Sequence, residues 1–288
     1  MKVLVIGADG QLGSDLCRVI APEEIIPLTI KELDITSREA VHTIVKKYQP
    51  GIVINTAAFH HVDKCEDEVE TAFNVNAVGV KYVAEACREH GVVLVQISTD
   101  YVFDGEKETP YVETDIPNPR SVYAASKLAG EQCAKYMLDK YFIVRSSGLY
   151  GAAGCMGKGG SNFVKNMIAR AKQEPFLKIV TDKMVSPTYT MDLAEKINEL
   201  MRTERYGTYH VVNHGSCSWH DFARKIFDLL GRTVEVHKVT GQNYKTPAKR
   251  PKYSVLKNAE LEKIGLDDMR SWQEALEAYL IAKGYLEL

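Results

Sequence analysis

The first half of the chain alternates short apolar runs with longer stretches in which apolar residues recur every three or four positions. Strand-length apolar runs separated by amphipathic helices are typical of a parallel sheet with helices on both faces. Strands are predicted at Lys2–Ile6, Ile25–Leu28, Ile52–Asn55, Val92–Ser98 and Phe142–Ser146, and helices at Leu12–Ile20, Ala40–Tyr48, Val69–Glu89 and Ser121–Met137. We therefore expect an α/β fold built on a doubly wound parallel sheet.

The second half begins with a glycine-rich stretch, Gly151–Gly160, in which neither a helix nor a strand is expected. Beyond it, helices are predicted at Asn162–Gln173, Met191–Met201, Trp219–Leu230 and Ser271–Lys283, and strands at Leu177–Val180 and Thr208–Val212. This mixture predicts a smaller mixed α/β domain. We place residues 1–147 in the first domain and residues 148–288 mainly in the second, with some later segments returning to the first.

The charge of the chain excludes several classes of partner. Its 288 residues include 36 Lys+Arg and 38 Asp+Glu, for a formal net charge of −2. A protein that binds nucleic acid or an anionic membrane needs a basic excess, so neither partner is expected. No apolar run approaches the roughly 20 residues of a membrane helix, and the apolar start meets glycine too early for a signal peptide. We expect a cytoplasmic protein whose six scattered cysteines are reduced thiols.

Three glycines, Gly7, Gly10 and Gly13, follow the first predicted strand and lead into an amphipathic helix. Glycines at such a turn let the backbone approach a dinucleotide pyrophosphate, whose charge meets the unpaired N–H groups of the helix start. The pattern predicts a Rossmann-type dinucleotide site. After the second strand, where an Asp or Glu normally bonds the ribose of NAD, Lys31 favours NADPH, while the nearby Glu32 keeps NADH open.

A tyrosine and a lysine, Tyr123 and Lys127, lie four residues apart in a predicted helix and therefore share one face. An ammonium group beside a phenol lowers the pKa of the phenol, which suits the tyrosine to exchange a proton with a carbonyl or alcohol oxygen. Thr99 follows the strand Val92–Ser98, and ligands bind at the carboxyl ends of such strands. Thr99 is therefore predicted to hydrogen-bond the oxygen that Tyr123 protonates.

Together these residues resemble the catalytic Ser or Thr, Tyr and Lys of the extended short-chain dehydrogenase/reductase superfamily. Further blocks, spread over essentially the whole chain, narrow the resemblance to the dTDP-4-dehydrorhamnose reductase family: Ser98-Thr-Asp-Tyr-Val-Phe-Asp-Gly105, Val122-Tyr-Ala-Ala-Ser-Lys-Leu-Ala-Gly-Glu131, Asn55-Thr-Ala-Ala58, Ser216-Cys-Ser-Trp-His-Asp221 and Thr246-Pro-Ala-Lys-Arg-Pro251. The resemblance implies that NADPH or NADH reduces the 4-keto group of dTDP-4-dehydro-L-rhamnose, in the synthesis of a nucleotide sugar for surface polysaccharides.

The resemblance also implies which residues bind the two ligands. The cofactor set comprises Gly7, Gly10, Gln11, Leu12, Gly13, Thr29, Asp34, Ile35, Ala57, Ala58, Phe59, Tyr123 and Lys127. The substrate set comprises His60, Thr99, Asp100, Gly148, Asn162, Phe163 and Arg250. In the implied mechanism Tyr123 donates a proton, Thr99 orients the sugar oxygen, and Lys127 holds the ribose and lowers the pKa of the tyrosine.

Two features depart from the family pattern. Better-known members have a tryptophan against the rhamnose ring where this chain has Gly148, so reduction of a different nucleotide-linked 4-keto-deoxysugar remains an alternative. The loop Gly151–Gly160 is longer than expected, and both a lid over the sugar and a plain surface loop remain open. A third alternative is a regulatory subunit that binds NADP without catalysis, against which the presence of Thr99, Tyr123 and Lys127 argues.

Basic side chains of the second half are candidates for binding a diphosphate: Lys158, Lys165, Lys249 and Arg250. The planar guanidinium of Arg250 suits two phosphate oxygens best. The cluster His60, His61, Asp63 and Cys65 lacks a second ligand group with zinc-like spacing, so no metal site is predicted there. The family includes monomers and homodimers held through a divalent cation such as Mg²⁺, and the sequence does not decide between them.

Overall fold

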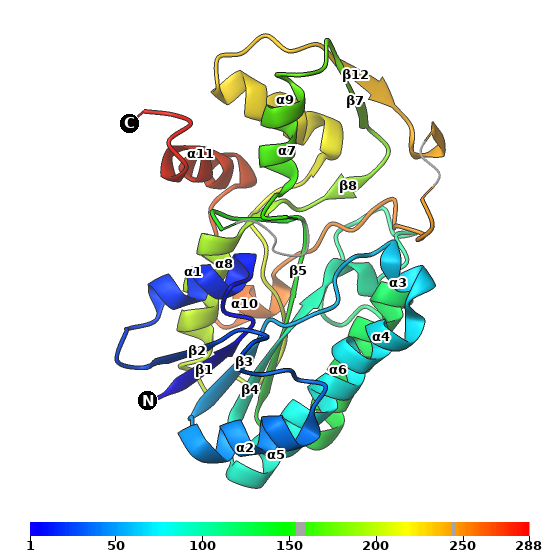
Figure 1. Ribbon diagram of the computed structural model, residues 1–288. Helices are drawn as coiled ribbons and strands as arrows, with labels where there is room; N and C mark the ends of the chain where they lie inside the picture. The colour runs from blue at the N-terminus through cyan, green and yellow to red at the C-terminus, as the bar shows by residue number, and fades with distance from the viewer. Residues whose placement is uncertain (154–158, 244–245, 288) are drawn as a thin grey trace.

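The computed structural model describes residues 1–153, 159–243 and 246–287. A six-stranded sheet, in the order β10-β5-β4-β3-β1-β2, forms its centre (Figure 1). Every strand pairing in this sheet is parallel. The strands are β1 (Val3–Ile6), β2 (Ile25–Leu28), β3 (Ile52–Asn55), β4 (Val93–Thr99), β5 (Tyr141–Ser146) and β10 (Gly207–His210). The prediction of a doubly wound parallel sheet is confirmed.

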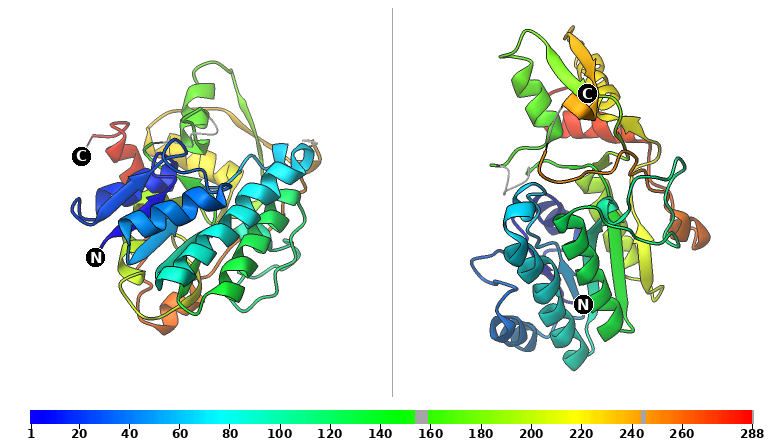
Figure 2. Two further views of the ribbon diagram at one scale, coloured as in Figure 1. Left: turned by 60° about the horizontal axis from the view of Figure 1, so that its bottom comes forward. Right: turned by 90° about the vertical axis from the view of Figure 1, so that its right-hand side faces the viewer.

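Helices cover both faces of the sheet, because successive side chains of a strand point to opposite faces. Val3 and Val5 of β1 face one apolar core, while Leu4 and Ile6 face the other. The first core is covered by α1 (Gln11–Val19), α8 (Thr190–Leu200) and α10 (Ala259–Lys263). The second is covered by α2 (Arg38–Tyr48), α5 (Val80–His90) and α6 (Val122–Met137), which lie across the sheet in the left view of Figure 2.

The direction in which strands are added to the sheet reverses at β1. Strand β2 lies on one side of β1 and β3 lies on the other. In open α/β sheets, ligands bind outside the carboxyl ends of the strands at such a reversal. The glycine turn follows β1 and the segment 56–61 follows β3, so both segments meet at this point.

A third apolar core lies in the part of the molecule drawn above the main sheet in Figure 1. It is built from α7 (Phe163–Arg170), α9 (Trp219–Leu229) and α11 (Trp272–Ala282) with three small sheets. The paired strands are β6 (Leu149–Tyr150) with β9 (Thr188–Tyr189), β7 (Leu177–Val180) with β12 (Val236–Val239), and β8 (Met184–Val185) with β11 (Cys217–Ser218). Two-residue strands carry too little periodicity to be read from sequence, so β6, β8, β9 and β11 were not predicted.

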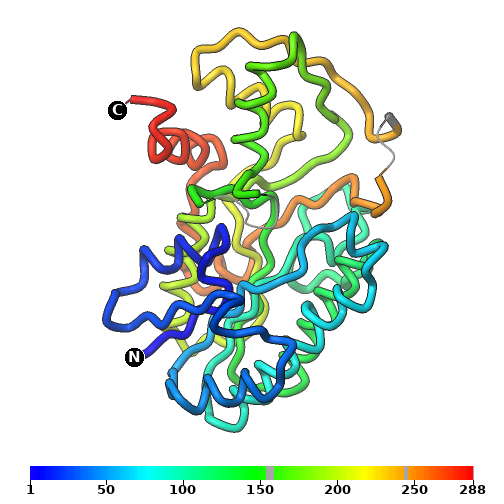
Figure 3. The backbone as a smooth tube through the Cα atoms, viewed as in Figure 1, coloured from blue at the N-terminus to red at the C-terminus, as the bar shows by residue number. Residues whose placement is uncertain are grey.

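Three elements from the second half of the chain, β10, α8 and α10, belong to the main sheet or pack against it. Strand β10, predicted as Thr208–Val212, pairs with β5 at the edge of the main sheet, and α8 and α10 pack on the core below it. The backbone tube in Figure 3 shows the two chain ends in different parts of the molecule, the first beside the main sheet and the last beside α11. The division of the chain at residue 147 stays a prediction.

The long helix predicted over Val69–Glu89 is interrupted. The structure has a short α4 (Val69–Phe73), a π-helical turn η1 (Asn74–Gly79) and then α5. A Cβ at Gly79 would lie 2.8 Å from Ile35 Cγ1, so the wide turn lets another segment come close. Single π-turns often occur at functional sites, and this one carries Asn76, which is almost fully buried.

Candidate active site

The glycine turn closes a tight cradle between β1 and α1. Gly7 has a positive φ of 80°, and a Cβ at Gly13 would lie 2.1 Å from the Gly7 carbonyl oxygen. Gly10 is the N-cap of α1, and its N–H donates to the Gly7 carbonyl at 3.0 Å. Gly7 and Gly13 leave no room for a Cβ, and the N–H groups at the start of α1 can meet an anion. These residues fit the pyrophosphate of a dinucleotide.

Two residues of this turn that were predicted to bind the cofactor, Gln11 and Leu12, have side chains with partners inside the protein. Leu12 is buried in the core between α1 and the sheet. Gln11 reaches the second half of the molecule, where its Oε1 accepts from the Gly151 N–H at 3.1 Å. Only the backbone of Gln11 and Leu12 is therefore placed to meet a phosphate.

The ribose end of the site carries a carboxylate. The Thr29 N–H donates to Glu32 Oε2 at 2.8 Å, and the Thr29 hydroxyl donates to the same oxygen at 2.5 Å. These bonds lower the pKa of Glu32. Asp34 accepts from the N–H and hydroxyl of Thr36, and Ile35 is buried against the π-turn. A negative Glu32 and a nearby Lys31 therefore both border this end.

Asn76 fixes the segment Ala57–Phe59, which was predicted to line the dinucleotide. The Phe59 N–H donates to Asn76 Oδ1 at 2.8 Å, and Asn76 Nδ2 donates to the Phe59 carbonyl at 3.0 Å. Asn76 Nδ2 also lies 3.0 Å from Ser126 Oγ, whose hydroxyl donates to the Tyr123 carbonyl at 2.8 Å. Sequence reasoning missed Asn76, because a regular helix would have hidden it among ordinary positions.

The structure brings Thr99, Tyr123 and Lys127 together at the carboxyl end of β4. Thr99 ends β4 and contacts Tyr123 on α6. Lys127 lies one helical turn further along α6 and donates from Nζ to the Ile97 carbonyl at 2.7 Å. The ring of Tyr101 stands edge-on to that of Tyr123, with centroids 6.2 Å apart. The meeting of Thr99, Tyr123 and Lys127 was predicted, from the helical spacing of the tyrosine and lysine and from the place of Thr99 at the end of a strand.

The electrostatic effect on Tyr123 differs from the expectation. Burial raises the pKa of the Tyr123 phenol above its ordinary value, hydrogen bonding with Thr99 lowers it only in part, and the Asp100 charge raises it further. Burial also lowers the pKa of Lys127 to about 8, against the opposing charge of Glu131. The predicted lowering of the tyrosine pKa by Lys127 is therefore absent, because Lys127 is bonded to the backbone of β4 and desolvation dominates.

A buried ion pair stands behind Lys127. Glu131 accepts from Arg145 at 2.9 and 2.6 Å and from the Ser98 hydroxyl at 2.6 Å. Both charged side chains are almost completely buried, at 0% and 2% exposure. The guanidinium also lies 5.3 Å from the centre of the Phe103 ring. Glu131 belongs to the quoted sequence block, but its partner on β5 was not predicted.

Asp100 was predicted to face the sugar, and the structure shows it enclosed by hydroxyl groups. It accepts from Ser147 at 2.8 Å and from Thr99 at 3.1 Å, and it is 3% exposed. Burial raises the pKa of Asp100 to about 6, although the hydroxyl donors Ser254, Ser147 and Thr99 oppose this. Since the Thr99 proton is directed to Asp100, a lone pair of Thr99 is left for another donor.

Arg250, the favoured diphosphate residue, is paired with Asp63. Its two terminal nitrogens donate to the two Asp63 oxygens, each at 2.8 Å. This pair lowers the pKa of Asp63. The two side chains are 22% and 40% exposed, so solvent reaches both partners. Any role of Arg250 at a diphosphate requires the guanidinium to leave or share this carboxylate.

The other predicted substrate residues have mixed surroundings. Asn162 caps α7 and is buried, with its amide donating to Gly151 and Tyr279. The Phe163 ring lies 4.6 Å from that of Trp219. His60 stacks on His61 with ring centroids 5.0 Å apart. Contact of these residues with a substrate stays a prediction.

The three lysines predicted as further candidates for binding the diphosphate lie in different surroundings. Lys165 donates to the backbone at Ala152 and Gly160, and Lys249 is exposed. Residues 154–158, half of the loop Gly151–Gly160, lie outside the described residues, and they include Lys158 and Cys155.

Gly148 follows β5 with a positive φ of 57°. A Cβ built there would lie 3.0 Å from Val185 Cγ2 and 3.1 Å from Pro187 Cα. The segment is packed around a glycine, so no side chain at this position enters without movement of its neighbours.

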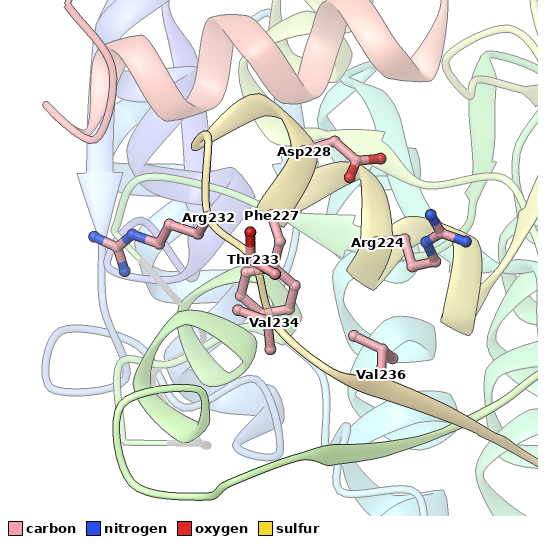
Figure 4. Close-up of a pocket in the computed structure, with 7 residues that line it drawn as sticks. All are labelled: Arg224, Phe227, Asp228, Arg232, Thr233, Val234 and Val236. Carbon is pink, nitrogen blue, oxygen red and sulfur yellow. The ribbon is translucent and has the colours of Figure 1, made fainter.

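Across the described ranges, no group of three or more His, Cys, Asp or Glu side chains is arranged to hold a metal ion, and no helix is long and apolar enough to cross a bilayer. A shallow pocket lies far along the chain from the glycine turn, on α9 and β12 (Figure 4). Arg224 and Arg232 point to opposite sides of it.

Comparison with known proteins identifies the family. A family model described as the RmlD substrate binding domain matches residues 1–284. The chain belongs to this family.

The chain aligns with individual relatives over nearly the whole length of both proteins. A spore coat polysaccharide biosynthesis protein of Bacillus subtilis, SpsK, is 42% identical over 97% of this chain and 96% of its own. A dTDP-4-dehydrorhamnose reductase of Clostridium acetobutylicum is 44% identical, with a TM-score of 0.94 over 98% of this chain and 99% of that one. The Bacillus anthracis enzyme of the same name, in complex with NADP, is 44% identical, with a TM-score of 0.93 over 98% and 100%.

Proposed function

We propose that this protein reduces the 4-keto group of dTDP-4-dehydro-L-rhamnose with NADPH and releases dTDP-L-rhamnose. The observation that carries the proposal is the meeting of Thr99, Tyr123 and Lys127 at the end of β4, on the same edge of the parallel sheet as the tight glycine turn after β1. The names of the relatives support the sugar, and the NADP complex of the Bacillus anthracis enzyme supports the cofactor.

The residues perform the proton half of the reaction. A bound nicotinamide supplies hydride to the sugar carbon. The buried Tyr123 phenol is neutral near neutral pH, and this is the form that can donate to the alkoxide oxygen that forms. Thr99 would turn its hydroxyl from Asp100 to donate to the same oxygen. Lys127, which is held by the Ile97 carbonyl, would bond the nicotinamide ribose. Arg250 is proposed to turn from Asp63 toward the substrate diphosphate, because its fork matches two phosphate oxygens.

The cofactor preference is decided at the ribose end. Glu32 suits the two hydroxyls of NADH, whereas Lys31 suits the extra phosphate of NADPH. We expect Glu32→Gln to raise the ratio of kcat/KM for NADPH over NADH several-fold, because it removes a negative charge without shortening the side chain. Lys31→Gln is the matched control and should lower the same ratio. A ratio unchanged in both variants contradicts this assignment.

Three accompanying expectations stay predictions. Mg²⁺ has no cluster of ligands in the described part of the chain. A monomer and a homodimer are both compatible with the resemblance, and the cytoplasmic location is an expectation from the apolar pattern of the sequence.

The first experiment follows the loss of reduced-nicotinamide absorbance when the protein meets dTDP-4-dehydro-L-rhamnose. Rapid oxidation that yields dTDP-L-rhamnose supports the proposal. Tyr123→Phe should lose about 10²- to 10⁴-fold in turnover while still binding NADPH. Cofactor binding without oxidation by the wild type would instead support the regulatory subunit.

Gly148 favours a second candidate, reduction of a different dTDP-linked 4-keto-deoxysugar. Without an aromatic side chain at this position, the protein lacks the wall that better-known family members place against rhamnose. Comparison of kcat/KM for epimeric dTDP-4-keto-6-deoxysugars decides between the two candidates. The rhamnose assignment fails if another epimer is preferred by more than about tenfold, or roughly 1.4 kcal/mol.

A further inference from the structure

The peptide of Gly151 is held from both halves of the molecule. On one side its N–H donates to Gln11 Oε1 at 3.1 Å, and Gln11 Nε2 makes a longer contact of 3.4 Å with the Leu149 carbonyl. On the other side Asn162 Nδ2 donates to the Gly151 carbonyl at 2.9 Å. Gln11 opens α1 and Asn162 caps α7, so this one peptide connects the starts of two helices.

The surroundings of Gly151 leave it little freedom. A Cβ at this position would lie 1.9 Å from the Thr190 hydroxyl oxygen. That hydroxyl donates to Asp15 of α1 at 2.6 Å, and Asp15 is fully buried. Gln11 and Asp15 lie one turn apart on the same face of α1. Helix α1 therefore contacts this region through two side chains: Gln11 bonds Gly151, and Asp15 bonds the neighbouring Thr190.

Asn162 transmits the position of Gly151 to α7. Its Oδ1 accepts from the Lys165 N–H at 3.0 Å, which satisfies one of the unpaired N–H groups at the start of the helix. Both amide hydrogens are used as well, by Gly151 and by the Tyr279 hydroxyl. A shift of Gly151 thus disturbs the cap of α7 directly.

We propose that Gln11 is a positioning residue whose side chain links the cofactor turn to α7 through the Gly151 peptide, so that a bound dinucleotide strengthens binding of the substrate nucleotide. In this proposal the cofactor phosphates contact the backbone of Gln11, while its side chain accepts the hydrogen bond from Gly151 in the second half of the chain. A bound dinucleotide fixes the start of α1 and thereby reduces the motion of Gly151 and Asn162. Binding of the substrate nucleotide then costs less conformational entropy. The identity of the two ligands rests on the proposed function.

Two measurements test the link. In the first, hydrogen exchange of Gly151 and of α7 is compared with and without NADP⁺, and the wild type should exchange more slowly when NADP⁺ is bound. Gln11→Ala should abolish this slowing. In the second, calorimetry should show NADP⁺ affinity within about twofold of wild type, while the affinity of the NADP⁺-loaded variant for dTDP falls about fivefold or more.

Matched variants separate the link from a folding defect. Asn162→Asp keeps the oxygen that caps α7 but removes the donor to Gly151, so it should reproduce both effects of Gln11→Ala. Ser14→Ala removes a hydroxyl on α1 that bonds only the Gln11 carbonyl, and it should change neither measurement. If Gln11→Ala does not fold, Gln11→Met, which keeps the length of the side chain but removes the acceptor for the Gly151 N–H, replaces it and should also abolish the slowing.

Two results overturn the proposal. One is slowing of exchange that survives in Gln11→Ala, or is absent from the wild type. The other is a tenfold loss of NADP⁺ affinity in Gln11→Ala with dTDP affinity unchanged, which would assign the side chain to the cofactor. A wild type that shows the slowing but binds no dTDP supports the link and counts against the proposed function, because the exchange measurement uses NADP⁺ alone.

Discussion

Two arginine–carboxylate pairs border the candidate active site, and they differ in burial. The pair of Arg145 and Glu131 lies behind Lys127 at 2% and 0% exposure, and a third group, Ser98, completes it. The pair of Arg250 and Asp63 lies at the rim, at 22% and 40% exposure. Both pairs use two parallel hydrogen bonds, so the chemistry of the two contacts is nearly the same.

The difference shows how burial decides what such a pair can do. Without solvent, no free ion can replace either member of the pair, so the pair is fixed and holds β5 against α6 behind Lys127. At the rim, water or an anion can replace a carboxylate at little cost. Arg250 can therefore exchange partners during a reaction cycle, whereas Arg145 cannot.

The largest effect is expected from breaking the buried pair. Glu131→Gln leaves Arg145 as an uncompensated charge, and its Nη1 atom already finds no hydrogen-bond partner among the described residues. We expect the free energy of unfolding to fall by about 3–5 kcal/mol, as measured by urea denaturation. The double variant Glu131→Met with Arg145→Met should recover most of this loss. A loss below about 1 kcal/mol in Glu131→Gln would contradict the assigned role.

A smaller effect is expected at Asp100, a buried carboxylate that has hydroxyl partners and no arginine. Its pKa is raised to about 6 from the ordinary 3.8, so the folded state binds this proton more tightly than the unfolded chain does. The resulting stabilisation is complete below the unfolded pKa and is lost as the pH rises through about 6. Relative to Asp100→Asn, wild-type stability should fall on the order of 2 kcal/mol between about pH 4 and about pH 7. Parallel urea-denaturation curves for the two proteins would exclude this raised pKa.

The smallest effect on stability is expected at the rim. Asp63→Asn should change the free energy of unfolding by less than about 1 kcal/mol. Because Arg250 loses its competing carboxylate, dTDP should bind several-fold more tightly, and Arg250→Gln should bind it more weakly. Calorimetric titration with dTDP measures both changes. A marked loss of stability in Asp63→Asn without tighter dTDP binding would mean that the rim pair is structural, like the buried one.

The parts of the fold that depend on local pattern could be predicted from the sequence. Strands β2, β3 and β7 occupy the predicted residues, because apolar runs bounded by turn residues are local signals. The break in the helix after Phe73 could not be predicted, because α-helical periodicity continues across it. Its cause is tertiary, namely the close approach of Ile35 and the bonds of Asn76 to Phe59.

In the candidate site too, residues related by local spacing could be predicted, whereas contacts that depend on tertiary packing could not. Tyr123 and Lys127 were found because their spacing on one helix is visible in the sequence. The partner of Glu131 was not found, because Arg145 lies on a different element and the pairing depends on how α6 packs against β5. The direction of the Tyr123 pKa shift also depends on desolvation, which requires a structure.

Gly148 restricts how the sugar specificity of this protein can change. A tryptophan at this position needs a codon change, a backbone that leaves the left-handed region and room taken from Val185 and Pro187. A single substitution would meet both structural obstacles at once, the backbone conformation and the lack of room beside the 185–187 segment. Laboratory evolution of this site is therefore better begun at Val185 and Pro187 than at the glycine itself.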